Sequence, residues 1–134
     1  MTATVVYEGE LRTSLTHLES KTVIQTDAPK DNHGKGEAFS PTDLVATALG
    51  ACMLSVMGIY ARQHNLDLRG ATASVQKNME ANPRRIASID LTVEMPANNF
   101  SARERSTLEH VAQTCPVANS LSGDLKQNIQ FVWL

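Results

Sequence analysis

Two cysteines, Cys52 and Cys115, are the side chains of this 134-residue chain best suited to covalent or redox chemistry. A thiolate can act as a nucleophile or be oxidised reversibly. Free cysteines are also among the most frequently buried residues, so each could be an ordinary core residue. Cys115 directly precedes Pro116, which predicts a helix start there. Unpaired N–H groups and the positive dipole end of that helix would favour a thiolate at Cys115.

Other catalytic patterns are weak or missing. The four histidines show no ligand spacing with each other or with the cysteines, so we expect no metal site. We find no GxGxxG, Walker or GxSxG motif, so a nucleotide cofactor and a serine hydrolase are not indicated. A Cys–His acyl-transfer enzyme stays open as an alternative, because a thiol nucleophile needs a nearby base. The histidines are His17, His33, His64 and His110.

Composition narrows the class of protein further. Hydrophobic residues make up 42% of the chain and charged residues 19%, which excludes intrinsic disorder. The net charge of −2 and six aromatic residues predict no nucleic-acid partner. The N-terminal segment lacks the basic and apolar regions of a signal peptide, so we expect a cytoplasmic protein with reduced thiols.

A long helix must hold Cys52. The segment Ser40–Asp43 is typical of a helix start, with a serine cap, a proline in the first turn and an acidic residue. We expect the helix to extend to about His64. Its apolar residues are spread over several faces, which predicts burial on most sides and favours a dimer that wraps this helix. Segment 44–61 is uncharged but short for a bilayer, so we expect a core helix and no membrane span.

Strands are expected on both sides of this helix. A second capping box at Ser101–Glu104 predicts a helix that ends near Cys115, followed by a short helix over 117–121. Segment 27–39 is rich in turn residues and predicts a long loop. The order βββ-α-ββ-αα-β predicts an α+β fold with a largely antiparallel sheet, in one domain over residues 1–134. The expected strands are 4–7, 10–16, 21–26, 71–75, 89–95 and 129–133.

Two segments resemble the cysteine motifs of the OsmC/Ohr family (osmotically inducible protein C and organic hydroperoxide resistance protein). SPTDLVATALGACM, residues 40–53, is similar to the family's central helix, and TCPVANSL, residues 114–121, to its second cysteine motif. The expected element order agrees over essentially the whole chain, and the OsmC-like subgroup is the more similar one. The resemblance implies an OsmC-like fold and an intertwined homodimer, with long buried central helices and sites at the dimer interface.

The same resemblance implies thiol-dependent reduction of organic hydroperoxides without a cofactor. Cys52 would attack the peroxide, Cys115 would resolve the sulfenic acid as a disulfide, and a dithiol, for instance of the lipoyl type, would restore both thiols. Burial at mid-helix disfavours a thiolate, so a cation is needed. The resemblance assigns this role to Arg12 in the second expected strand. The family's glutamate near the helix start is replaced by Thr42, which leaves Glu37 and Asp43 as candidate activating carboxylates.

Two further hypotheses remain at this point. A non-enzymatic, stress-associated OsmC-like dimer that binds a small molecule would carry vestigial thiols, and Thr42 in place of the glutamate favours it. The Cys–His acyl-transfer enzyme is the other. A peroxidase predicts rapid alkylation of Cys52 and ready disulfide formation, whereas a binding module predicts slow alkylation.

Overall fold

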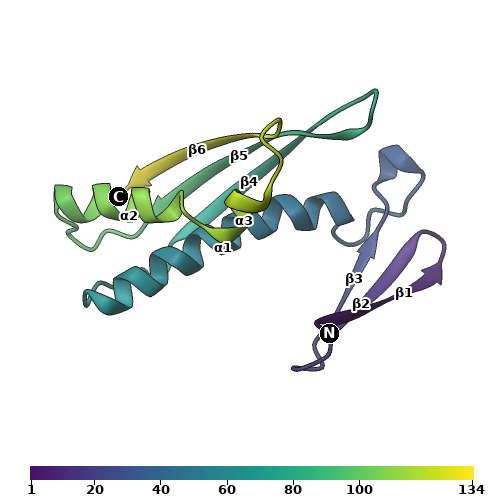
Figure 1. Ribbon diagram of the computed structural model, residues 1–134, viewed down its shortest axis with the longest axis horizontal. Helices are drawn as coiled ribbons and strands as arrows, with labels where there is room; N and C mark the ends of the chain where they lie inside the picture. The colour runs from purple at the N-terminus through teal and green to yellow at the C-terminus, as the bar shows by residue number, and fades with distance from the viewer. The chain divides into compact units, whose positions relative to one another are not determined.

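The computed structural model describes all residues, 1–134. The chain divides into two compact units, residues 1–45 and residues 46–134, and each is described by itself (Figure 1). The elements follow the expected order βββ-α-ββ-αα-β, with an added 3-10 turn. They are β1 (Ala3–Gly9), β2 (Arg12–His17), β3 (Val23–Asp27), η1 (Lys30–Asn32), α1 (Pro41–Gln63), β4 (Thr72–Glu80), β5 (Arg85–Met95), α2 (Ala102–Ala112), α3 (Pro116–Ser120) and β6 (Lys126–Trp133).

The first unit is built on the antiparallel meander β1-β2-β3, as the three short β-branched runs predict. It has no buried hydrophobic side chain, and its buried residues are the polar Thr26, Asp27 and Ser40. A sheet normally buries one apolar face against another layer. Within residues 1–45 neither face of this sheet is covered by a hydrophobic layer. The exposed large apolar side chains of the unit are Val5, Val6, Tyr7, Leu11, Val23, Ile24, Phe39 and Val45.

Helix α1 begins where the sequence predicts. The hydroxyl of Ser40 accepts from the backbone N–H of Asp43, while the Asp43 carboxylate accepts from the N–H of Ser40, both at 3.0 Å. Further along, Gly50 faces the β4–β5 hairpin so closely that a Cβ there would lie 3.3 Å from the side chains of Ala73 and Val75. Glycine therefore lets the turn of α1 next to Cys52 approach the sheet.

The strand pairing is largely antiparallel, as expected, but the strands form two sheets and not one. Strands β4, β5 and β6 form a separate sheet in which β4 and β5 are antiparallel and β6 is parallel to β5. The chain returns to β5 through α2 and α3, and a crossover of that kind permits parallel pairing. The strands are also longer than predicted, because the hairpin pairing continues beyond the alternating apolar residues.

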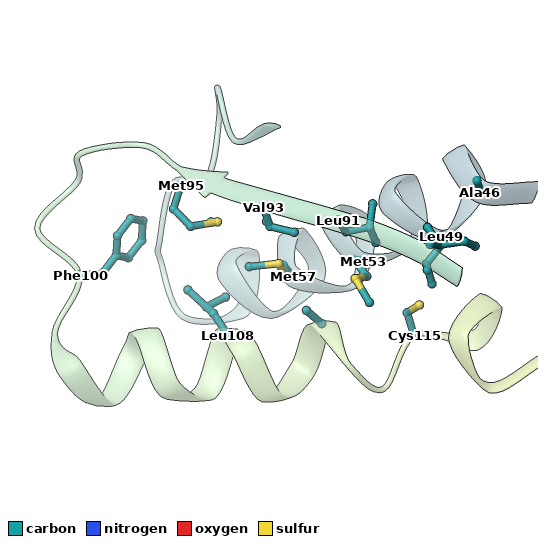
Figure 2. Packing of buried hydrophobic residues seen from close by; sticks show 12 residues of the cluster. Ala46, Leu49, Met53, Met57, Leu91, Val93, Met95, Phe100, Leu108 and Cys115 are labelled. Atoms are coloured by element: carbon teal, nitrogen blue, oxygen red, sulfur yellow. The ribbon is translucent and has the colours of Figure 1, made fainter. Parts of the chain in front are cut away.

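Buried side chains from β5, α1 and α2 form the core of this unit (Figure 2). Leu91, Val93 and Met95 of β5 alternate with outward-facing polar residues, as the sequence pattern predicts. They face Met53 and Met57 of α1 in Figure 2. The remaining buried members are Ala46, Leu49, Ile89, Phe100, Leu108, Ala112 and Cys115.

Within one chain, α1 is buried on one side only, whereas the sequence predicts burial on most sides. Its buried residues follow helical spacing from Ala46 to Ala61, and the opposite side exposes Ile59 among others. The helix is long and apolar enough to cross a membrane by length and composition, and one third of its most apolar window is buried. The core helix of a soluble protein meets the same criterion.

Candidate functional site

The fold brings Cys52 and Cys115 together in the second unit. Cys52 is a partly buried residue near the middle of α1 and packs against the core cluster, whereas Cys115 is a fully buried member of that cluster. Both are free thiols, and Cys52 lies close enough to Cys115 to influence its ionisation. Residues 63 positions apart in the sequence therefore form one thiol pair, in which Cys52 is partly buried and Cys115 is fully buried.

Cys115 caps helix α3, as its position before Pro116 predicts. Its sulfur accepts a hydrogen bond from the N–H of Ala118 at 3.3 Å. Burial nevertheless raises the pKa of the Cys115 thiol, and the neighbouring Cys52 raises it further, while the Ala118 N–H only partly offsets both. The N–H groups at the start of α3 lower the pKa of this thiol, as the sequence predicts, but burial raises it by more. The net effect is a Cys115 thiol whose pKa lies above its ordinary value.

Apolar side chains surround the thiol pair. Leu49, Met53 and Met57 of α1 are fully buried core residues. A pocket of about 320 Å³ is lined by Met53 together with Gln113, Gln127 and Ile129. Met53 directly follows Cys52 in α1. It therefore belongs to the buried core and also lines this pocket, whose walls are partly polar and partly apolar.

The first unit contains a cluster of charged side chains centred on Arg12. Its Nε donates to Asp27 Oδ1 at 2.7 Å and its Nη2 donates to Asp27 Oδ2 at 2.8 Å. The same Nη2 also donates to Glu37 Oε2 at 3.3 Å. Of the predicted site residues, Arg12 and Glu37 are therefore brought together within residues 1–45, and Asp27 joins them.

Asp27 is the functional candidate that the sequence pattern did not reveal. It looks like the first residue of a turn-rich loop, but it is the last residue of β3 and only 1% of its side chain is exposed. Hydrogen bonds from Arg12 and from the backbone N–H of Glu37 hold the pKa of Asp27 below its ordinary value, against the effect of burial. In turn, Asp27 first and Glu37 second raise the pKa of Arg12. The β2–β3 register pairs Asp27 with Arg12, and this pairing becomes visible only in the structure.

Asp43, the other candidate carboxylate, is occupied at the start of α1. Its carboxylate accepts from the Ser40 N–H, and the Thr42 hydroxyl lies 3.2 Å from the Ser40 hydroxyl. This capping arrangement explains an acidic residue at that position without a catalytic role. Thr42, which stands where the family has a glutamate, therefore places its hydroxyl next to the Ser40 hydroxyl at the start of α1.

Two of the histidines make local contacts of their own. His64 Nδ1 lies 2.9 Å from the carbonyl oxygen of Tyr60, and the two rings stack at 3.9 Å. In the first unit, His17 Nδ1 lies 2.7 Å from the Ser20 hydroxyl. No group of three or more His, Cys, Asp or Glu side chains is placed to hold a metal ion.

Comparisons with known proteins give one consistent family. The sequence model of the OsmC-like protein family matches residues 34–130. A solved protein from Psychrobacter arcticus 273-4, provisionally described as an osmotic stress induced and detoxification response protein, is 45% identical. Its TM-score is 0.94, over 98% of this chain and 95% of that one. A search of curated proteins found no match.

Two more distant structures share the fold. An organic hydroperoxide resistance protein OsmC from Legionella pneumophila is 18% identical with a TM-score of 0.76, over 98% of this chain and 97% of that one. A Vibrio cholerae protein, provisionally described as an organic hydroperoxide resistance protein, has captopril bound in one of its active sites. It is 21% identical with a TM-score of 0.70, over 98% of this chain and 91% of that one.

Proposed function

The chain belongs to the OsmC-like protein family, and we propose that it is a thiol-dependent peroxidase that reduces organic hydroperoxides. The observation that carries this proposal is the pairing of a partly buried cysteine with a fully buried one. Proteins with this fold include ones described as organic hydroperoxide resistance proteins, and this supports organic hydroperoxides as the substrate class of this chain.

The proposed reaction begins at Cys52, the accessible thiol of the pair. Its thiolate attacks the terminal peroxide oxygen, the O–O bond breaks, and the alkoxide leaves and takes up a proton to become an alcohol. Cys52 is then a sulfenic acid. Cys115 attacks the Cys52 sulfur, its thiol proton joins the departing hydroxide to form water, and a disulfide results.

Reduction of the disulfide requires an external dithiol, which we propose to be of the lipoyl type. Cys115 is fully enclosed, so the incoming thiolate reaches the Cys52 sulfur and Cys115 is the leaving thiol. A second thiol of the reductant then releases Cys52 and closes a disulfide in the reductant. In this cycle two electrons pass from the dithiol to the hydroperoxide, and both protein thiols are restored.

We further propose that the active form is a homodimer. The first unit exposes several large apolar side chains and lacks a buried hydrophobic core, and α1 exposes Ile59 on its unpacked side. Exposed apolar surface of this extent marks an interaction surface. The captopril-bound V. cholerae protein has more than one active site, which is consistent with a dimer. A mass of two chains by light scattering is expected, and a stable single chain would contradict the dimer.

Steady-state turnover tests the proposed function. With dihydrolipoamide as reductant, the protein is expected to consume cumene hydroperoxide and dithiol in equal amounts. Because apolar side chains surround Cys52, we expect cumene hydroperoxide to be preferred over hydrogen peroxide by at least about tenfold in kcat/KM. A rate equal to that of dihydrolipoamide alone would contradict the peroxidase and favour the ligand-binding alternative.

A further inference from the structure

We propose that Gln127 is a positioning residue, which ties the short helix α3 to strand β6 and thereby holds the Cys115 sulfur beside Cys52. This inference rests on the proposed function, in which the two thiols form a disulfide. It goes beyond it by giving a role to a residue outside the thiol pair and by naming the step that depends on it. All the residues concerned belong to the second unit.

Gln127 is a polar residue on the inner side of β6. The other side chains on that side are partly buried and pack against the core cluster; they are Ile129, Phe131 and Trp133. Gln127 is itself half-buried, and a buried amide without a hydrogen-bond partner costs free energy. Its Nε2 donates to the backbone carbonyl oxygen of Ala118 in α3 at 3.1 Å. A polar side chain in an apolar row thus binds the backbone of the neighbouring helix.

Ala118 connects this amide to the thiol. Its N–H donates to Cys115 Sγ at 3.3 Å, and its carbonyl oxygen accepts from Gln127. The backbone N–H of Asn119 also donates to the carbonyl oxygen of Cys115, at 3.1 Å. Cys115 is therefore joined to α3 at both its side chain and its backbone. A displacement of α3 relative to β6 would move the Cys115 sulfur with it.

The other contacts of α3 hold it less firmly to the sheet. The helix has five residues, none of them fully buried, and a helix that short is not stable on its own. Its other side-chain hydrogen bonds come from Asn119 and Ser120 and reach carbonyl oxygens five and four residues earlier in the chain. The pocket of about 320 Å³ lies beside Gln127, so packing is open at this place. The hydrogen bond from Gln127 therefore fixes α3 relative to β6.

A fixed α3 favours disulfide formation, because the two sulfurs must meet. Cys52 packs against the core cluster to which Cys115 belongs. Holding one thiol beside the other removes most of the entropic cost of bringing them together, which favours the disulfide in both rate and equilibrium. Attack of Cys52 on the peroxide precedes any reaction at Cys115. Gln127 therefore supports the resolving step and leaves the first step unaffected.

Gln127→Met tests this role, since methionine has nearly the same length but no N–H donor. In a glutathione redox buffer, we expect the ratio of Cys52–Cys115 disulfide to dithiol to fall about threefold to tenfold, as for the loss of one hydrogen bond. Conversion of the Cys52 sulfenic acid to the disulfide should slow by a similar factor. The rate of sulfenic acid formation with cumene hydroperoxide should stay unchanged. Acid quenching followed by intact mass measures all three quantities.

Two variants of the same strand serve as controls. Gln130 is exposed on the outer side of β6, so Gln130→Met should give wild-type values. Gln127→Lys restores an N–H donor at the inner position and should lie closer to the wild type than Gln127→Met does. Thermal unfolding of each variant verifies that the fold is kept.

A folded Gln127→Met protein with the wild-type redox equilibrium would overturn the proposal. Equal slowing of sulfenic acid formation and of its resolution would also overturn it, because the effect would then not be specific to Cys115. If Gln127→Met does not fold, Gln127→Glu, which keeps the shape but turns a carboxylate oxygen toward the Ala118 carbonyl, must show the same loss.

The redox-buffer measurement uses no peroxide, so it separates this inference from the proposed function. A wild-type chain that forms the disulfide but does not reduce hydroperoxides would contradict the proposed function alone. A wild-type chain that forms no Cys52–Cys115 disulfide in the buffer would overturn the role of Gln127.

Discussion

Replacing Cys52 by serine is expected to abolish hydroperoxide reduction, so that peroxide loss falls to the rate of the dithiol alone. A serine hydroxyl stays protonated at neutral pH and cannot cycle through a sulfenic acid, so no later step can begin. The measurement is steady-state consumption of cumene hydroperoxide with dihydrolipoamide. We also expect the variant to lose rapid alkylation, because Cys115 is fully enclosed.

The same variant should fold normally. Cys52 is only partly buried and serine has nearly the same shape, so the free energy of unfolding should change by about 1 kcal/mol or less. Thermal unfolding checks this directly. A folded Cys52→Ser protein that keeps measurable turnover would contradict the assignment of Cys52 as the attacking thiol.

Removing Cys115 is expected to stop the cycle after one turnover. Cys115→Ala keeps the attacking thiol, so a burst of alcohol equal to the protein concentration should remain, and Cys52 should then accumulate as a sulfenic acid. Steady-state turnover should fall by at least about tenfold, and excess peroxide should convert Cys52 to the sulfinic acid. Rapid-quench product analysis and intact mass, which reports each added oxygen, follow both stages.

Alanine is the better replacement at this position. Cys115 is fully buried, and a serine hydroxyl there would cost about 1–3 kcal/mol if left without a partner. Cys115→Ala adds no polar group, and it removes only the hydrogen bond from the Ala118 N–H in the first turn of α3. Wild-type turnover in this variant would show that resolution does not use Cys115.

Local sequence signals predict the helices well. A serine cap and a proline in the first turn mark the start of α1, and a capping box of Ser101 and Glu104 marks the start of α2. In both cases the signal and the structure involve neighbours in the chain, so sequence alone is sufficient. Apolar and polar residues alternate strictly over 89–95, and this pattern likewise identifies which face of β5 lies in the core.

Pairings between distant segments are less accessible from sequence. The parallel β5–β6 pair and the division into two sheets depend on how the chain crosses back, which alternation within a strand does not report. Residue type singles out both cysteines, but their proximity arises only when α1 and the α2–α3 junction pack together. The raised pKa of Cys115 has the same origin, because burial outweighs the local helix end.

Asp27 illustrates why the charged group could be found only in part. Arg12 and Glu37 enter the prediction through the family resemblance, whereas Asp27 reads as turn chemistry beside Pro29. Its burial follows from strand pairing, since β2 and β3 place it opposite Arg12. A buried aspartate in a short polar strand has no signature of its own in one sequence.

Peptide mapping after one equivalent of cumene hydroperoxide tests the central claim most directly. The account predicts loss of two hydrogens from the intact mass, no added oxygen, and a disulfide-linked peptide pair that contains Cys52 and Cys115. Subsequent dihydrolipoamide should return both thiols. An unchanged mass with both thiols still free would contradict the peroxidase and leave a ligand-binding protein of the same family as the better description.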